Sequence, residues 1–179
     1  QLPDRQLELA IVGRSNVGKS SLINALANRK KLAKISKTPG ATQLINIYEL
    51  KPEGSGNWLV DLPGYGFAKA PKTEMERWRR MIEEYLLESS TLGAVILLID
   101  SAVGPTPLDL QTIEWLDHID LPYRFVATKS DKVRSSKSAA RKKDLLTKLG
   151  AEKKDVMWVS VVNGTGIPQL RSEIINFFL

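Results

Sequence analysis

The sequence predicts an α/β fold, in which helices cover both faces of a mostly parallel β-sheet. Three observations lead to this expectation. Apolar runs rich in β-branched residues alternate with helical patterns along the whole chain, and such alternation builds parallel sheets with two covered faces. A glycine-rich turn at residues 13–20 separates the first strand from the first helix. Polar loops at residues 61–64, 128–131 and 160–166 follow later strands, where sheets of this kind bind ligands.

Six segments have the composition of strands. Residues 93–100 are almost wholly apolar and end in Asp100, which is the pattern of a buried strand. A turn-forming segment with one proline and two glycines separates residues 45–50 from 57–61, so we expect two strands joined by a short loop. The predicted strands are residues 7–12, 45–50, 57–61, 93–100, 123–128 and 156–160.

Five segments have helical patterns. In residues 74–89 the apolar side chains Trp78, Met81, Ile82 and Tyr85 recur at the spacing of one helix face. This spacing favours a core-facing position for Trp78 and Tyr85 over stacking on RNA. The predicted helices are residues 19–28, 74–89, 107–119, 136–149 and 167–179.

The length of 179 residues is enough for a sizeable core, and we expect residues 1–179 to form one domain. The longest apolar run, residues 94–99, is far too short to span a bilayer. The absence of cysteine excludes disulfides, thiol catalysis and cysteine-ligated zinc. The chain shows no signal-peptide pattern but opens at Gln1, so an earlier targeting segment is left open.

Positive charge is concentrated in one part of the chain. Between Thr128 and Asp155 the basic residues exceed the acidic ones by six, which equals the net charge of the whole chain, +6. Two interpretations remain open, a lysine-rich helix face in water and a patch that faces RNA. Composition alone does not decide between them.

The segment GRSNVGKS, residues 13–20, has the full spacing of a phosphate loop. Its glycines let the backbone wrap closely, so that consecutive N–H groups point at phosphate, and the following helix adds its positive N-terminal end. Lys19 is expected to face the β- and γ-phosphates, and the Ser20 hydroxyl to bind magnesium. The strand before the segment and the helix after it argue against a chance glycine-rich turn.

Two tetrapeptides that follow this loop in the sequence have the residues expected to complete a nucleotide site. In DLPG, residues 61–64, the carboxylate can hold magnesium through water and the Gly64 N–H can meet the γ-phosphate. In TKSD, residues 128–131, Asp131 can accept the two donors that guanine presents side by side and adenine lacks. Lys129 is expected to lay its aliphatic stem along the base. Each tetrapeptide alone is a common loop, and their order makes them informative.

The order GRSNVGKS, TPGATQ, DLPG, TKSD and SVVNGTG resembles that of the translation-factor-related GTPases, in the TrmE-Era-EngA-EngB-Septin-like class. The segments SKTPGATQLIN (residues 36–46) and LVDLPGYGFA (residues 59–68) are most similar to EngB-type (YihA/YsxC) ribosome-biogenesis GTP-binding proteins. The resemblance runs from about Leu7 to the C-terminus. It implies a Ras-like P-loop GTPase domain with a six-stranded sheet and helices on both faces.

The resemblance also implies site residues, carried over by position. Thr42 would be the first-switch threonine that binds Mg²⁺ beside Ser20, and Asp61 would reach the ion through water. Lys19, Thr42 and Gly64 would serve catalysis. The implied GTP- or GDP-binding set is Gly13, Arg14, Ser15, Asn16, Val17, Gly18, Lys19, Ser20, Ser21, Thr38, Pro39, Gly40, Ala41, Thr42, Asp61, Leu62, Pro63, Gly64, Thr128, Lys129, Ser130, Asp131, Ser160, Val161 and Val162.

Several positions depart from the common GTPase pattern, and two further residues bear on the expected chemistry. Thr128 stands where most GTPases have Asn, which would loosen the base loop, and Val161 replaces a small residue whose backbone N–H reads the guanine O6. Tyr65 stands where Ras-like proteins place the glutamine that orients water, so we expect slow hydrolysis. The only histidine, His118, is expected to have a surface or packing role. Similar GTPases bind K⁺ at the position of Asn16, for which a role in the loop turn alone is the alternative.

The function implied by the resemblance is a GTP-dependent switch in assembly of the large ribosomal subunit. Its partners would be ribosomal RNA and the large-subunit precursor, with no membrane partner and a monomeric state. Residues 29–37, with five bases and no acid, are expected to be a loop of the first switch and, with the basic residues 136–154, to contact RNA. The expected location is the bacterial cytoplasm, or an organelle of bacterial origin.

Three alternatives stay open. A P-loop kinase or ATPase would need an adenine pocket, against which the TKSD loop argues. A nucleotide-binding module without significant turnover is favoured by Tyr65. A GTPase that acts on another RNA, such as tRNA, on a membrane or on another partner would be expected to carry an appended domain for it.

Overall fold

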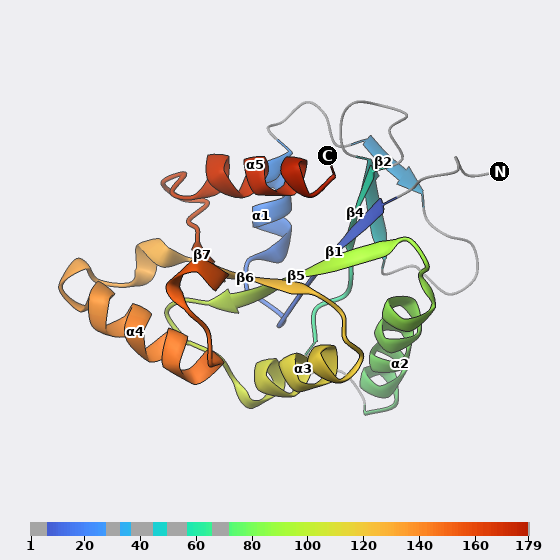
Figure 1. Cartoon of the computed structure of the whole chain (residues 1–179), viewed down its shortest axis with the longest axis horizontal. Helices are drawn as coiled ribbons and strands as arrows, with labels where there is room; N and C mark the ends of the chain where they lie inside the picture. Colours follow the sequence, from blue (N-terminus) through green and yellow to red (C-terminus); the bar gives the residue numbers. More distant parts are fainter. Residues whose placement is uncertain (1–6, 28–32, 37–44, 50–56, 66–71, 179) are drawn as a thin grey trace.

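The computed structural model of the protein describes residues 7–27, 33–36, 45–49, 57–65 and 72–178. The strands form one sheet between two layers of helices, and from β4 onward strands and helices alternate along the chain (Figure 1). The strand order is β2-β3-β4-β1-β5-β6-β7. Neighbours from β4 to β7 in that order are parallel, whereas β3 is antiparallel to both of its neighbours. The predicted α/β class with a mostly parallel sheet is confirmed.

All six predicted strands are present, and a short edge strand is added to them. The strands are β1 (Leu7–Gly13), β2 (Ala33–Ser36), β3 (Asn46–Glu49), β4 (Asn57–Asp61), β5 (Leu92–Asp100), β6 (Tyr123–Thr128) and β7 (Val156–Trp158).

The edge strand β2 corrects the expectation that residues 29–37 form only a loop. Ala33–Ser36 pairs antiparallel with β3 and makes the sheet seven-stranded. The basic composition of the segment suggested a loop, but lysine is also the residue with which natural sheets protect exposed edges. The rest of residues 29–37 lies outside the described part of the chain.

Five α-helices flank the sheet in the described residues: α1 (Lys19–Leu26), α2 (Lys72–Glu88), α3 (Pro107–His118), α4 (Ser138–Leu149) and α5 (Ile167–Phe177). Helix α3 begins with a capping box between Thr106 and Asp109 and has Pro107 in its first turn, and α4 ends at Gly150 in the left-handed conformation. These residue types favour such helix ends. None of the helices described is both long and apolar enough to cross a membrane.

The helices cover the sheet in two layers, with α1 and α5 on one face and α2, α3 and α4 on the other (Figure 1). Strand β5 serves both layers because its side chains alternate, with Leu97 facing α3 and α4 and Leu98 facing α1 and α5. Tyr85 packs on the core from α2, as its spacing predicts. The side chain of Trp78 lies outside the described part of α2.

Candidate functional site

The parallel strands bring four loops to one edge of the sheet. The phosphate loop follows β1, DLPG follows β4, TKSD follows β6, and Ser160–Val162 lie just past β7. Strand β1 lies between β4 and β5, and β6 lies between β5 and β7. The carboxyl ends of parallel strands therefore place all four sequence motifs on the same side of the molecule.

The phosphate loop forms a tight turn into α1. Val17 N–H bonds to the Arg14 carbonyl at 3.1 Å, and Asn16 has a φ of 64°. Gly18 precedes the helix with a φ of 101°, a conformation that favours glycine. Ser20 and Ser21 are exposed in the first turn of α1.

The DLPG loop packs directly on the phosphate loop. The ammonium of Lys19 forms an ion pair with the carboxylate of Asp61 at the end of β4. The Ser15 N–H bonds to the Tyr65 carbonyl at 2.7 Å, and the Tyr65 N–H bonds to the Gly13 carbonyl at 3.2 Å. A Cβ on Gly64 would lie 3.1 Å from the Ser15 nitrogen, which is a tight contact, so this close approach favours glycine.

The side chain of Tyr65 joins the end of the DLPG loop to α3. Its hydroxyl donates to Asp109 in the first turn of α3 at 2.6 Å. Burial, and then the nearby charge of Asp109, raise the pKa of Tyr65 well above its ordinary value. The phenol therefore stays protonated and anchors the loop to α3.

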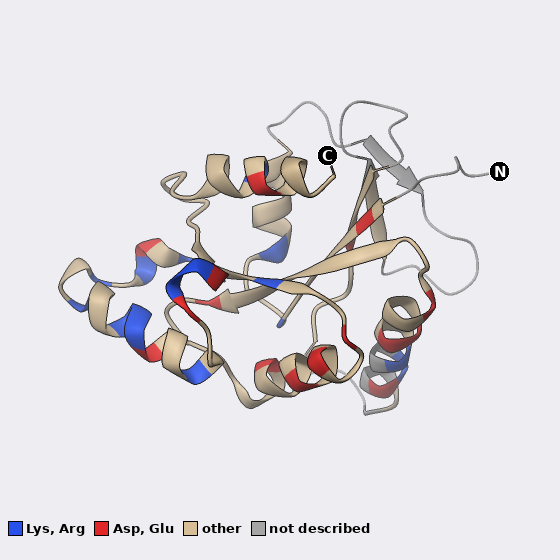
Figure 2. Ribbon diagram, in the orientation of Figure 1, with Lys and Arg blue, Asp and Glu red and all other residues tan. Residues whose placement is uncertain are grey.

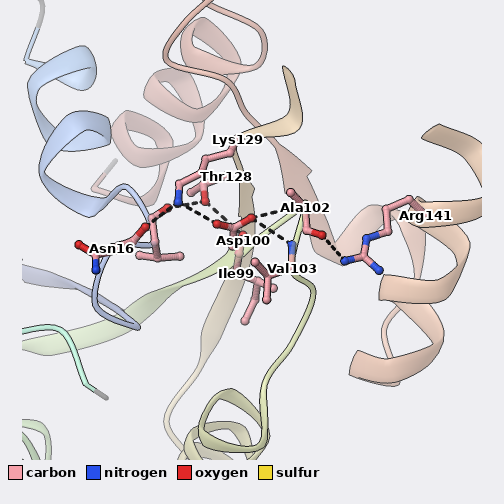
Figure 3. Close-up of polar contacts among 9 residues, drawn as sticks. Asn16, Ile99, Asp100, Ala102, Val103, Thr128, Lys129 and Arg141 are labelled. Atoms are coloured by element: carbon pink, nitrogen blue, oxygen red, sulfur yellow. Dashed lines mark hydrogen bonds and ion pairs between the residues drawn. The ribbon is translucent and has the colours of Figure 1, made fainter. Parts of the chain in front are cut away.

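The TKSD loop is tied to the phosphate loop by two side chains (Figure 3). The buried Thr128 hydroxyl donates to the Val17 carbonyl at 2.7 Å. The Lys129 ammonium donates to the Asn16 carbonyl at 2.6 Å and to Asp100 at 2.8 Å. The bond from Thr128, a residue that we expected to loosen the loop, thus holds the two loops together.

Asp131 is held by the loop that follows β7. The hydroxyl of Ser160, which is fully buried, donates to Asp131 Oδ1 at 2.6 Å. The Ser130 N–H bonds to the Val159 carbonyl at 3.0 Å, which joins the two loops through their backbones. The Asp131 carboxylate itself is exposed at the edge of the sheet, and so are Val161 and Val162.

The structure thus gathers most of the predicted site residues. The group from the first switch, Thr38, Pro39, Gly40, Ala41 and Thr42, lies outside the described residues. The contacts that were not foreseen include Asp100 with Lys129, Asp109 with Tyr65, and the use of the Ser160 hydroxyl to hold Asp131. The one available signal was the polar residue Asp100 at the end of an otherwise apolar strand.

Comparison with known proteins agrees with this arrangement. A family model described as "50S ribosome-binding GTPase" matches residues 8–129. A protein of Fusobacterium nucleatum named "Probable GTP-binding protein EngB" is 42% identical over 172 residues, which cover 96% of this chain and 84% of that protein. The chain belongs to the EngB family of GTP-binding proteins.

Further EngB-family proteins give the same result. The Clostridium beijerinckii protein of the same name is 44% identical over 177 residues, which cover 98% of this chain and 86% of that protein. The match to the Pelotomaculum thermopropionicum protein reaches 53% identity over 133 residues and spans 74% of this chain and 65% of that relative's length.

Solved structures show the same fold. A crystal structure of a probable GTP-binding protein EngB superposes with a TM-score of 0.74 at 25% identity, covering 96% of this chain and 98% of the other. Era, crystallised with MgGDPNP and nucleotides 1506–1542 of 16S ribosomal RNA, has a TM-score of 0.66 at 23% identity, covering 97% of this chain and 57% of that one. At that identity the likeness to Era concerns the fold alone.

Proposed function

We propose that this EngB-family chain is a GTP-dependent switch that binds guanine nucleotide with Mg²⁺, hydrolyses GTP slowly and acts in assembly of the large ribosomal subunit. The main support is Asp131, which lies in the loop that Thr128 and Lys129 tie to the phosphate loop. One of its oxygens accepts from Ser160, and an exposed carboxylate keeps further acceptor sites for the N1–H and 2-amino group of guanine.

The residues near Lys19 fit a nucleotide with magnesium. Ser20 offers a hydroxyl and Asp61 a carboxylate, and Mg²⁺ prefers oxygen ligands while keeping several waters and phosphate oxygens. Within the described residues no group of three or more His, Cys, Asp or Glu forms a metal site, which suits an ion held largely by phosphate. Lys19 and Asp61 pair with each other, and we infer that nucleotide redirects Lys19 to phosphate and Asp61 to a metal-bound water.

Slow hydrolysis is supported by the engagement of Tyr65 with Asp109. A phenol held in this way neither accepts a proton from water nor orients it as a glutamine does. The same contact favours a second candidate, a nucleotide-binding module without significant turnover. Asn16 has an exposed side chain, and we propose it as an oxygen ligand for K⁺; single-turnover hydrolysis that is equal in K⁺ and Na⁺ would refute that part.

A basic surface supports RNA as the partner. We define the α4 surface as the exposed cations of the 3-10 turns η1 (Ser130–Lys132), η2 (Ser135–Lys137) and η3 (Lys153–Asp155) and of α4, together with Arg134 between η1 and η2. The elements that carry these cations lie at one end of the molecule (Figure 2). The principal members of the α4 surface, for which the structure gives no acidic partner among the described residues, are Lys132, Arg134, Lys137, Lys143 and Lys153.

Acidic residues of the same segment already form ion pairs with other cations. Asp144 pairs with Arg141 and Lys148, and Glu152 pairs with Lys154. The positive charge of the α4 surface is therefore not compensated locally, which favours an RNA-facing patch over a neutralised helix face. In this proposal GTP orders the loops near Gly64 and promotes binding to the precursor, and hydrolysis reverses it.

Calorimetric titration tests the nucleotide site. Wild type should bind GDP and a GTP analogue in the presence of Mg²⁺ but not ATP, and Asp131→Asn should lose GDP while gaining xanthosine diphosphate. Asp120→Asn is a matched control because Asp120 is exposed at a loop with a φ of 54°, which asparagine tolerates. If ATP binds with the same affinity as GDP, the proposal that Asp131 recognises guanine is wrong.

Sedimentation with purified large-subunit precursors tests the switch. The protein should co-sediment with the precursor when loaded with a GTP analogue and be released when loaded with GDP. Equal co-sedimentation with both nucleotides would leave a static binding module as the better description. Absence of binding in both states would refute the ribosomal partner while leaving the nucleotide site intact.

A further inference from the structure

Asp100 lies where strand β5 ends, directly beside the TKSD loop. It is paired in register with Thr128 of β6. Its side chain is only 5% exposed, so its charge must be compensated within the protein. None of the roles given above uses this buried carboxylate.

The Asp100 carboxylate is fixed by the backbone of the turn that follows it (Figure 3). Oδ1 accepts from the N–H groups of Ala102 at 2.9 Å and Val103 at 3.2 Å. Arg141 of α4 holds this turn from outside, since it donates to the Ser101 carbonyl at 3.0 Å and to the Ala102 carbonyl at 2.5 Å. These bonds fix the orientation of the Asp100 carboxylate and leave Oδ2 as a free acceptor towards the TKSD loop.

Oδ2 of Asp100 accepts from the Lys129 ammonium at 2.8 Å. Burial alone would raise the pKa of Asp100, but the hydrogen bonds from Lys129 and from the two turn N–H groups outweigh it and lower the pKa. The carboxylate is thus ionised at neutral pH. The same ammonium bonds to the Asn16 carbonyl, so the end of the Lys129 side chain is held at two points.

The stem of Lys129 runs along the phosphate loop. A Cβ on Gly18 would lie 3.6 Å from Lys129 Cε, and Lys129 itself has a left-handed backbone with a φ of 55°. A free lysine side chain samples many rotamers, and fixing them costs binding energy. Because the stem is the expected platform for the base, the group that immobilises its far end also pre-organises the guanine site.

We propose that Asp100 is a positioning residue of the guanine site, which holds Lys129 in place against the phosphate loop and thereby slows nucleotide release. The inference rests on the proposed guanine site and adds a residue to it. A wild-type protein that fails to bind fluorescent GDP would refute the site itself. The experiment below instead tests Asp100 in a protein that binds GDP.

Asp100→Asn removes this one contact. The amide oxygen can still accept from the turn N–H groups, whereas its NH₂ group faces the ammonium of Lys129 as donor to donor. Release of fluorescent GDP should accelerate about tenfold, because a hydrogen bond between charged groups contributes roughly this factor. Lys129→Met, which keeps the stem without the charge, provides the second arm of a double-mutant cycle.

If Asp100 acts through Lys129, then adding Asp100→Asn to Lys129→Met should change the release rate less than about twofold. The proposal is overturned if Asp100→Asn releases GDP at the wild-type rate. It is also overturned if Asp100→Asn accelerates GDP release tenfold both in the wild type and in Lys129→Met. The melting temperature of each nucleotide-free variant separates misfolding from a local effect. Should Asp100→Asn fail to fold, Asp100→Ser decides by the same criteria, since its hydroxyl can cap the turn but cannot reach Lys129.

Discussion

The Tyr65 hydroxyl donates a 2.6 Å hydrogen bond to Asp109, a carboxylate that is 2% exposed in the first turn of α3. The second oxygen of Asp109 accepts from the backbone N–H and the hydroxyl of Thr106, both at 2.7 Å. One buried carboxylate thus joins the loop after β4 to the start of a helix. The aromatic ring at this position is a structural tie between the two elements.

Tyr65→Phe should destabilise the protein by about 1–3 kcal/mol, because it leaves one oxygen of a buried carboxylate without its donor. Urea denaturation at neutral pH measures the change. Tyr123→Phe is the matched control, since the Tyr123 hydroxyl donates to Asp117 at 2.8 Å at an exposed position. Equal losses in the two variants would contradict the special role of Tyr65.

The same contact predicts a dependence on alkaline pH. Burial and the charge of Asp109 raise the pKa of Tyr65 above the ordinary value of 10.0. A raised pKa in the folded state contributes stability that is fully present below the unfolded pKa and is lost as the pH rises towards the folded value. The stability gap between wild type and Tyr65→Phe should therefore narrow above about pH 10. Urea denaturation over this range checks it, and a constant gap would contradict the prediction.

Thr128→Val should weaken GDP binding about fivefold, since valine keeps the shape of threonine but cannot donate to the Val17 carbonyl of the phosphate loop. Titration with fluorescent GDP measures the affinity. Thr147→Val, at an exposed position on α4, makes the same chemical change away from the loops and should leave the affinity unchanged. An unaltered affinity in Thr128→Val would show that the bond between the loops is dispensable.

Most of the fold and the local parts of the site could be predicted because their signals are local. Periodicity indicated the six main strands, and the spacing of the phosphate-loop glycines indicated a turn between β1 and α1. Strand β2 was missed since its formation depends on the exposed edge of β3, which no pattern within residues 29–37 records.

The contacts that orient the site could not be predicted because they join distant parts of the chain. Ser160 and Asp131 are 29 positions apart, and Tyr65 and Asp109 are 44 apart. The motifs identified Asp131, Ser160 and Tyr65, but they do not indicate that Ser160 bonds to Asp131 or that Tyr65 bonds to Asp109. Only the sheet order brings these partners together.

Ser160→Ala tests one of these distant contacts. Without the hydroxyl, Asp131 loses the donor that fixes Oδ1. GDP affinity should fall by about tenfold to a hundredfold, because hydrogen bonds to charged groups contribute roughly 1.5–3 kcal/mol. Ser172→Ala is a suitable control, since the Ser172 hydroxyl bonds to the Pro168 carbonyl on an exposed face of α5. The idea fails if Ser160→Ala binds GDP as tightly as Ser172→Ala, measured calorimetrically.

The α4 surface predicts a salt-dependent affinity for RNA. Lys137, Lys143 and Lys153 are exposed, and the structure assigns them no acidic partner among the residues it describes. Replacing all three by Glu should reduce the slope of log affinity against log salt by roughly two to three, since each phosphate contact contributes about 0.7–0.9. Fluorescence anisotropy with ribosomal RNA between about 50 and 200 mM salt measures this slope.

The matched control for this prediction replaces the same three lysines by arginine, which keeps the charge and should keep the slope. GDP affinity should be equal in wild type and both triple variants, because none of these side chains contacts the nucleotide loops in the contacts described. If the glutamate variant binds RNA with an unchanged slope, the α4 surface is not the contact. The lysine-rich face would then be a solvated helix surface, and RNA would have to bind elsewhere on the chain.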